Sequence, residues 1–315
     1  MICRSAEETT TCCRAPVILG SCFRRASIVF AIRAVETHRL IIPPRRVRPA
    51  TANLNPSAPG PYSRRTVSHA PPSYQQPDLV DVWDRVSESY KGIDLSAPDH
   101  QASMRRFLEV TGDPRGRSFC EVGSGSGTTS GALAAMGARI TLVDLSPKSL
   151  AFARRHFEEH GLEATYALQD GLRLGFRDGS FDVVWNGGVI EHFTDEGKVA
   201  LIREMYRVTR PGGLLLIIVP NAHDWPFRLG KWIAERRGKW IFGFEDDLAE
   251  GRFRRLAASA GIQGAAFQAH NPIVGWWFLP YGRRITGLLG LNTPRWHAKR
   301  SRFGHALAMS ARKPG

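Results

Sequence analysis

The chain has 315 residues and a hydrophobic content of 43%, which is typical of a globular protein and allows one large domain with extensions or two small domains. No apolar run approaches the ~18 residues that a membrane-spanning helix needs, which excludes such a helix. The net charge of +14 is uneven, because residues 1–76 and 251–315 are basic while residues 77–250 are mildly acidic. This asymmetry favours contact with an anionic surface or substrate, although a chain-wide preference for Arg over Lys accounts for it equally well.

Residues 1–76 are rich in Pro, Ser and Arg and show no hydrophobic periodicity, so we expect a disordered N-terminal segment. The same composition resembles an organelle transit peptide, which leaves import into an organelle as an alternative to a cytoplasmic location. Four of the five cysteines lie in the first 22 residues, and none has the spacing of a metal-binding pair. We therefore expect no metal site and no disulfide framework, which favours a reducing compartment.

From residue 77 onward, predicted helices and strands alternate. Short apolar stretches bounded by turn residues predict strands, and amphipathic stretches between them predict helices. Such alternation gives an α/β, Rossmann-like doubly wound sheet of about seven strands, mostly parallel, with helices on both faces. The strands are predicted at 118–122, 139–143, 164–168, 181–185, 214–219, 264–269 and 305–310.

The predicted helices carry recognisable ends. An apolar stripe indicates helices over 79–90 and 104–111, and Gly112 ends the second. Ser146, Thr194 and Asp247 are each expected to cap a helix N-terminus. The Arg-Pro-Gly-Gly sequence at 210–213 is expected to form a turn before the fifth strand.

The stretch 118–128 is predicted to be a strand, a turn with three glycines and a helix start, which is the form of a nucleotide-binding corner. A dinucleotide site would have a glycine where Thr128 stands, and a phosphate-binding loop would have a Gly-Lys-Ser/Thr sequence, which is absent. Glu121, before the first glycine, suits a positively charged ligand such as S-adenosylmethionine. Asp144 and Asp170, at the ends of the next two strands, are placed to accept hydrogen bonds from ribose hydroxyls and from an adenine amino group.

The motifs along residues 80–221 resemble those of the class I S-adenosylmethionine-dependent methyltransferases, in the type-11 group that is similar to ubiquinone and menaquinone methyltransferases. The matching pieces are Glu-Val-Gly-Ser-Gly-Ser-Gly at 121–127, Val-Asp-Leu-Ser-Pro at 143–147, Asp-Gly-Ser-Phe-Asp-Val-Val-Trp at 178–185, Gly-Val-Ile-Glu-His at 188–192 and Arg-Pro-Gly-Gly at 210–213.

This resemblance implies a methyltransferase domain over 77–315, an antiparallel last strand, and S-adenosyl-L-methionine as the cofactor. It implies that the three corner glycines line the methionine and ribose part of the cofactor, and that Asn186 flanks the methionine end. The cofactor-binding residues implied are Tyr90, Glu121, Gly123, Gly125, Gly127, Asp144, Leu145, Asp170, Gly171, Asn186 and Gly187.

The methyl acceptor is expected to be a small molecule, apolar or anionic, methylated on an O, N or C centre. Asn186 is followed by Gly-Gly and not by Pro-Pro-aromatic, which disfavours the amino-methylating nucleic-acid enzymes of this fold. The alternatives are a nucleic-acid or protein methyltransferase recruited by its basic ends, and a non-catalytic binding protein that retains the cofactor motifs.

His192 is the candidate general base, because it follows the fourth strand where the acceptor is expected; the alternative is a histidine that braces this loop. Two inserts, at 222–245 and 272–302, combine aromatic with basic residues. Such segments are expected either to pack as a lid over the substrate or to make peripheral membrane contact through 225–244 or 272–302.

Overall fold

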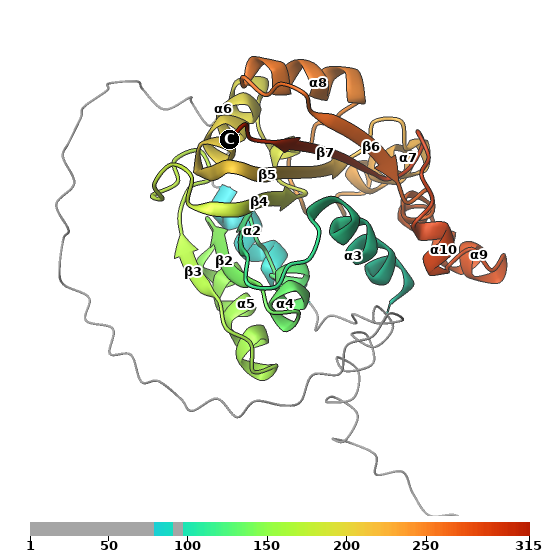
Figure 1. The fold of residues 1–315 in the computed structure, drawn as a ribbon. Coiled ribbons are helices and arrows are strands. Elements are labelled where there is room, and N and C mark those ends of the chain that lie inside the picture. Colours follow the sequence, from blue (N-terminus) through green and yellow to red (C-terminus); the bar gives the residue numbers. More distant parts are fainter. Residues whose placement is uncertain (1–78, 91–96) are drawn as a thin grey trace, which may run out of the picture.

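A seven-stranded sheet forms the centre of the protein in the computed structural model, which describes residues 79–90 and 97–315 (Figure 1). The strand order is β3-β2-β1-β4-β5-β7-β6, in which β7 runs antiparallel to both β5 and β6. This confirms the predicted mostly parallel sheet with an antiparallel last strand. The strands are β1 Ser118–Val122, β2 Arg139–Asp144, β3 Thr165–Leu168, β4 Phe181–Gly187, β5 Thr209–Pro220, β6 Ala266–His270 and β7 Ala306–Arg312.

The helices begin and end largely where local chemistry indicates. Ser146 Oγ accepts a hydrogen bond from Ser149 N, and Thr194 Oγ1 accepts one from Gly197 N, so both predicted N-caps are confirmed. The helices are α2 Leu79–Ser87, α3 Pro98–Thr111, α4 Thr128–Ala135, α5 Pro147–Glu159, α6 Asp195–Val208, α7 Trp225–Arg236, α8 Glu250–Ser259, α9 Gly282–Leu288 and α10 Pro294–His297, with 3-10 turns η1 Ile190–His192 and η2 Val274–Phe278.

Two apolar clusters cover the two faces of the sheet. Successive residues of β5 alternate between them, because successive side chains of a strand point to opposite faces: Leu214 and Leu216 lie in one cluster, and Leu215 and Ile217 in the other. The first face is covered by α3, α4 and α5, and the second by α6 and α8, which lie together in Figure 1. The sheet is therefore doubly wound, as the sequence predicts.

Two sequence predictions are wrong in detail. Arg210–Gly213 does not form a turn outside the sheet; it is part of β5, as a bulge where the pairing with β4 jumps from Thr209 to Leu214. Asp247 does not cap α8, whose N-cap is Ala249 and which has no side-chain cap. Asp247 instead accepts a hydrogen bond from Lys231 Nζ at 3.0 Å, because a buried ammonium needs a partner.

The two inserts pack against each other beside the carboxyl end of the sheet. The first contains α7, capped by Asp224, and the second contains η2, α9 and α10. α7 contacts η2 so closely at Gly230 that a Cβ there would lie 2.5 Å from the Phe278 carbonyl oxygen. No helix among residues 79–90 and 97–315 is long and apolar enough to cross a bilayer. The predicted disorder of residues 1–76 and the domain boundary at residue 77 lie outside the described residues.

The contact between α7 and η2 can be tested by adding one methyl group. We expect Gly230→Ala to lower the free energy of unfolding by about 1–3 kcal/mol, because backbone atoms of η2 must move. The matched control is Gly251→Ala on α8, where the nearest atom to a new Cβ is the Arg255 side chain at 4.0 Å. There, helix propensity predicts no loss and a gain of up to about 1 kcal/mol in denaturant unfolding. Equal effects of the two substitutions would contradict this packing.

Candidate active site

The corner between β1 and α4 requires glycine. Gly123, Gly125 and Gly127 have φ angles of 70°, 51° and 67°, in the left-handed region that other residues rarely adopt. A Cβ on Gly123 would lie 2.5 Å from the Val189 side chain, and a Cβ on Gly125 would lie 2.9 Å from the Tyr90 hydroxyl. The turn thus places bare backbone at the carboxyl end of the sheet, as the sequence predicts.

Asp144 ties this corner to the end of β2. Its two carboxylate oxygens accept hydrogen bonds from Gly125 N and Ser146 N, both at 2.8 Å. Burial raises the pKa of the Asp144 carboxyl, and the backbone hydrogen bonds act in the opposite direction. Leu145 N is a third backbone donor to this carboxyl, and a carboxylate has about four acceptor positions, so Asp144 can still accept a hydrogen bond from a ligand hydroxyl.

Glu121 is a buried acid at the floor of the same corner. Ser130 Oγ donates a hydrogen bond to Glu121 Oε2 at 2.6 Å. Burial is the main cause that raises the pKa of Glu121 to about 8, with a smaller contribution from the Asp144 charge. The free protein therefore holds a protonated Glu121 at neutral pH, and a cation bound nearby would favour its ionised form.

The helix α2 covers the corner from outside the sheet. Asp84 accepts a hydrogen bond from Ser146 Oγ at 2.5 Å, and the exposed pair of Glu88 and Lys148 lies at 2.9 Å. Tyr90, just after α2, packs edge-on against Phe152 with ring centroids 5.3 Å apart. These contacts hold the Tyr90 hydroxyl over Gly125.

A cavity of about 420 Å³ lies between α2 and the carboxyl ends of β1, β2 and β4. The glycine corner with its two acids forms part of its lining. Much of the remaining lining is apolar, with two imidazoles, and we call these residues the apolar compartment: Leu79, Trp83, His100, Trp185, His192, Phe193 and Ile218. The cavity thus combines a polar cradle with an apolar compartment.

His192 lies in this apolar compartment. Its Nδ1 is 2.6 Å from the Phe244 carbonyl oxygen, which can only accept, so Nδ1 carries the proton and Nε2 of the neutral ring has a free lone pair. Trp83 packs edge-on against the imidazole with centroids 5.0 Å apart. The pKa of His192 is lowered to about 4, mainly by burial, and the charges of Lys231 and Lys198 act in the same direction. The ring is therefore neutral at physiological pH.

Two buried lysines hold the loop that carries the Phe244 carbonyl. Lys198 Nζ donates to the Phe193 carbonyl at 2.6 Å and to Asp246 Oδ2 at 2.7 Å. Lys231 Nζ donates to the Glu245 carbonyl at 2.6 Å. The hydrogen-bond partner of His192 is thus fixed by charges on two different helices, α6 and α7.

The structure brings most of the predicted site residues together. The cavity is lined by Tyr90, Glu121, Gly123, Gly125, Asp144, Leu145, Gly171, Gly187 and His192. Three others do not line it. Gly127 packs against the Leu142 side chain, where a Cβ would lie 2.9 Å away, and Asp170 Oδ1 accepts a hydrogen bond from Leu172 N at 2.9 Å. Asn186 Nδ2 points to Met205 Sδ at 3.3 Å, on the α6 side of the sheet.

The structure adds residues that the sequence analysis did not place in the site. His100, on α3, lines the apolar compartment, and nothing in the local sequence of α3 distinguishes it from a surface histidine. Gln169 lines the cavity just after β3. Its place at a strand end, beside Asp170, is a sequence pattern from which a site residue could have been predicted. Trp185 is the last residue of the predicted fourth strand, where it resembles any core residue.

The residues present fit a sulfonium nucleotide. Two residues that line the cavity, Ser124 and Trp185, each carry a buried polar atom, Oγ and Nε1, that has no hydrogen-bond partner among the described residues. Glu121 suits an ammonium group, Asp144 suits a ribose diol, and the glycine cradle admits a ligand against the backbone. Among the described residues, no lysine or arginine lines the cavity.

Comparisons with known proteins agree with this geometry. The family model described as a methyltransferase domain matches residues 120–217. The chain is 30% identical over 162 residues to a ubiquinone biosynthesis O-methyltransferase of Xanthomonas axonopodis pv. citri, covering 50% of this chain and 67% of that relative. It is 34% identical over 116 residues to a demethylmenaquinone methyltransferase of Thermus thermophilus, covering 36% and 52%. The chain spans about two thirds of the length of the ubiquinone relatives it matches.

Solved structures support the fold. A chain from the complex of the Haloferax volcanii Trm112 methyltransferase activator with a methyltransferase matches with a TM-score of 0.52 at 18% identity, covering 76% of this chain and 97% of that one. Sheet order, glycine corner and sequence matches lead to one conclusion: the chain belongs to the class I S-adenosylmethionine-dependent methyltransferases, in the type-11 group, and its cofactor is S-adenosyl-L-methionine.

Proposed function

We propose that this protein transfers the methyl group of S-adenosylmethionine to a ring hydroxyl of an apolar small molecule of the quinol type. The observation that carries the proposal is the mixed lining of one cavity, which the acidic glycine corner shares with the apolar compartment that contains His192. The names of the relatives support the acceptor class, since they act in ubiquinone biosynthesis, on demethylmenaquinone and on 2-methyl-6-phytyl-1,4-hydroquinone.

The glycine corner would hold the cofactor, which supplies a methyl group activated on a sulfonium. Glu121 would pair with the ammonium group of its methionine part, and Asp144 would accept hydrogen bonds from the ribose hydroxyls. Asn186 and Asp170 do not line the cavity in the structure. Their contacts, of Asn186 with the methionine end and of Asp170 with the adenine, stay predictions. Positioning of this kind can supply on the order of 7–11 kcal/mol of the barrier when donor and acceptor are aligned.

The apolar compartment would hold the acceptor and exclude water. Trp83 and Phe193 supply flat apolar surfaces for a ring, and His192 Nε2 supplies the lone pair that accepts the hydroxyl proton. With a pKa of about 4, His192 is a weak base toward a free phenol. It would therefore accept the proton as the O–C bond forms, when the hydroxyl has become strongly acidic.

The alternative role of His192 also has a contact to support it. The hydrogen bond from His192 Nδ1 to the Phe244 carbonyl joins η1 to the loop after α7, so the side chain also braces the wall of the cavity. The two roles use different ring atoms, Nε2 for the proton transfer and Nδ1 for the brace. They can be separated because an Asn amide nitrogen can replace Nδ1 and leaves no base at the position of Nε2.

We expect both His192→Ala and His192→Asn to lower turnover by about 100-fold or more with a hydroquinone acceptor and methyl-labelled cofactor, because both remove the base. Cofactor affinity is expected to stay unchanged in both. In the wild type, kcat should fall only as the pH approaches 4, since His192 is neutral above that value. Wild-type turnover in His192→Asn would reduce His192 to a brace, and no labelled product from ring-hydroxyl acceptors in the wild type would contradict the proposed function.

We also propose that the protein binds the surface of an anionic membrane through the α7–α9 face, which consists of α7, η2 and α9. α7 contacts η2, and η2 contacts α9, so the face is continuous. Trp232 is 50% exposed, Tyr281 78% and Leu288 81%, which are high values for large apolar side chains. The other exposed apolar residues here are Trp225, Leu229, Trp276, Phe278, Ile285 and Leu289.

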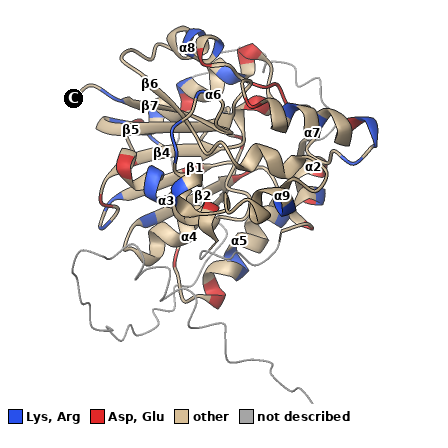
Figure 2. Cartoon of the chain, turned by 90° about the vertical axis from the view of Figure 1, so that its right-hand side faces the viewer, with Lys and Arg blue, Asp and Glu red and all other residues tan. Residues whose placement is uncertain are grey.

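The charge of this face supports a lipid partner. Lys and Arg residues lie on α7 and α9 (Figure 2). The exposed acid of α7 is Glu235, and residues 251–315, which include η2 and α9, contain no acidic residue. The exposed cations are Arg228, Arg236, Arg237, Arg283 and Arg284. The loop after α7 connects this face to the cavity. Phe242 on that loop packs against Trp83 in the cavity wall, with ring centroids 6.5 Å apart. A quinol with an apolar tail would thus enter the site from the lipid. A cytoplasmic location with peripheral membrane contact is part of this proposal.

Flotation with liposomes tests the lipid partner. We expect the wild type to float with vesicles that contain anionic lipid, and Arg283→Gln with Arg284→Gln to weaken the partition roughly 30-fold, from about 1 kcal/mol per cation. The matched control is Arg154→Gln with Arg155→Gln, an exposed pair on α5 away from the face, which should float like the wild type. Equal flotation of the two double variants would assign lipid binding to another part of the chain.

A further inference from the structure

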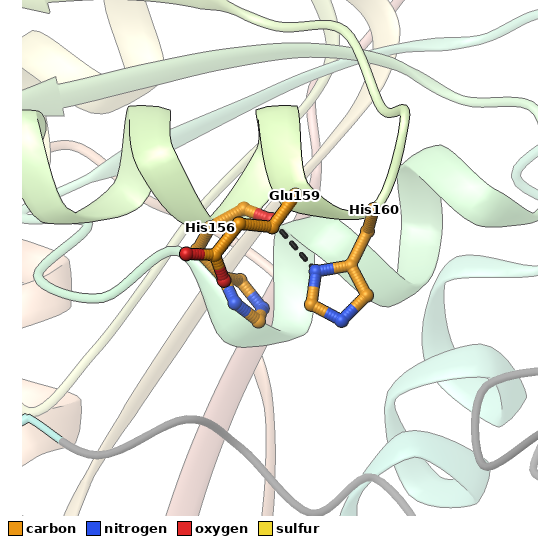
Figure 3. Close-up of side chains that lie close together, drawn as sticks. All are labelled: His156, Glu159 and His160. Atoms are coloured by element: carbon orange, nitrogen blue, oxygen red, sulfur yellow. Dashed lines mark hydrogen bonds between the residues drawn. The ribbon is translucent and has the colours of Figure 1, made fainter. Parts of the chain in front are cut away.

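The last turn of α5 gathers three side chains that ligate metals. His156, Glu159 and His160 lie at positions i, i+3 and i+4, which project from one face of a helix. Their ligand atoms lie within 4.8 Å of one another, and Figure 3 shows them grouped below the end of the helix. Residues 79–90 and 97–315 contain one such group, and it lies outside the cavity of the active site.

The ring of His160 is oriented by a hydrogen bond to the helix backbone. His160 Nδ1 lies 2.7 Å from the His156 carbonyl oxygen (Figure 3), and the carbonyl can only accept, so Nδ1 carries the proton. Nε2 therefore keeps its lone pair for a metal. This is the arrangement of metal-binding histidines in general, in which the second ring nitrogen donates to a carbonyl or carboxylate that fixes the tautomer.

The position in the helix also favours a cation. His160 is the C-cap residue of α5, where the unpaired carbonyls carry partial negative charge. His156 is half-buried, and its ring stacks on Phe152 with centroids 6.4 Å apart. The two imidazoles lie edge to face with centroids 4.5 Å apart.

We propose that His156, Glu159 and His160 form a site for a divalent transition-metal ion of the zinc type. Two imidazole nitrogens and one carboxylate oxygen suit Zn²⁺, whereas Mg²⁺ and Ca²⁺ prefer oxygen ligands throughout. Zn–N and Zn–O distances of about 2.0–2.2 Å place tetrahedral ligand atoms about 3.4 Å apart. Ligand atoms that now lie within 4.8 Å of one another would reach this spacing by rotation of the exposed Glu159 side chain and of the two imidazoles. Three protein ligands leave one tetrahedral position for water.

The site is connected to the cofactor pocket through aromatic packing. Phe152 lies between His156 and Tyr90, with centroid distances of 6.4 Å and 5.3 Å. The bound ion would therefore stabilise the C-terminal end of α5, the helix that packs against Tyr90, and it would take no part in methyl transfer. The spacing of the cysteines predicts no metal site, whereas the ligands here are histidines one helical turn apart and a glutamate between them.

Zinc binding to the full chain, free of any affinity tag, tests the proposal by equilibrium dialysis against Zn²⁺ and metal analysis. We expect His156→Gln with His160→Gln to bind one Zn²⁺ per chain fewer than the wild type. His223→Gln, which changes an exposed histidine outside the cluster, should bind as the wild type does. The N-terminal cysteines are present in every variant, so the difference counts this site alone. Equal zinc content of the wild type and the double variant would overturn the site.

A second variant keeps the test valid if the double histidine variant does not fold. Glu159 is exposed, so Glu159→Gln leaves the packing of α5 intact. We expect it to weaken Zn²⁺ affinity by roughly 10-fold or more, since loss of even an outer-shell partner of a metal ligand costs 10–100-fold. Thermal unfolding should show a Zn²⁺-dependent rise in Tm for the wild type that is smaller in Glu159→Gln. An unchanged affinity and an unchanged rise would overturn the carboxylate as a ligand.

Discussion

The active site depends on a turn that only glycine can make. Three glycines with left-handed φ angles follow β1, and the space that a Cβ would take at the first two is filled by Val189 and Tyr90. The same turn presents Gly125 N to Asp144, so the ends of β1 and β2 are locked to each other. The covering helix α2, the cavity and the position of Tyr90 all follow from this one backbone path.

Three acids at and near the active site have largely buried side chains, and of these Glu245 has a lysine close by, with its Oε1 3.9 Å from Lys231 Nζ. Burial raises the pKa of Glu121 and of Glu191 to about 8, and that of Glu245 to about 7. Each group binds its proton more tightly in the folded than in the unfolded chain, so its contribution to stability is full below about pH 4.5 and is lost as the pH rises through 7 to 8. A cation bound at Glu121 stabilises the ionised carboxylate and so offsets the loss of stability at high pH. The stability of the corner is therefore coupled to its ligand.

Local chemistry predicted the elements that depend on neighbours in the sequence. The glycine corner, the Ser146 cap and the acids at strand ends were readable because each acts within a few residues. What was missed depends on contacts across the fold. Asp247 accepts a hydrogen bond from Lys231 and does not cap α8. His100 lines the cavity from α3, whose sequence pattern shows only an apolar stripe. Asn186 ends the expected strand, but its side chain turns toward Met205, because alternation along β4 assigns it to that face.

The central claim is that the corner binds a cationic methyl donor through a carboxyl that is protonated in the free protein. Isothermal titration calorimetry with S-adenosylmethionine at pH 6.5, in two buffers of different ionisation enthalpy, measures this directly. The account predicts that binding releases about one proton per cofactor in the wild type, because the ammonium lowers the pKa of Glu121 from about 8, and that Glu121→Gln releases about one fewer. No binding at millimolar cofactor, or the same proton release in both proteins, would contradict it.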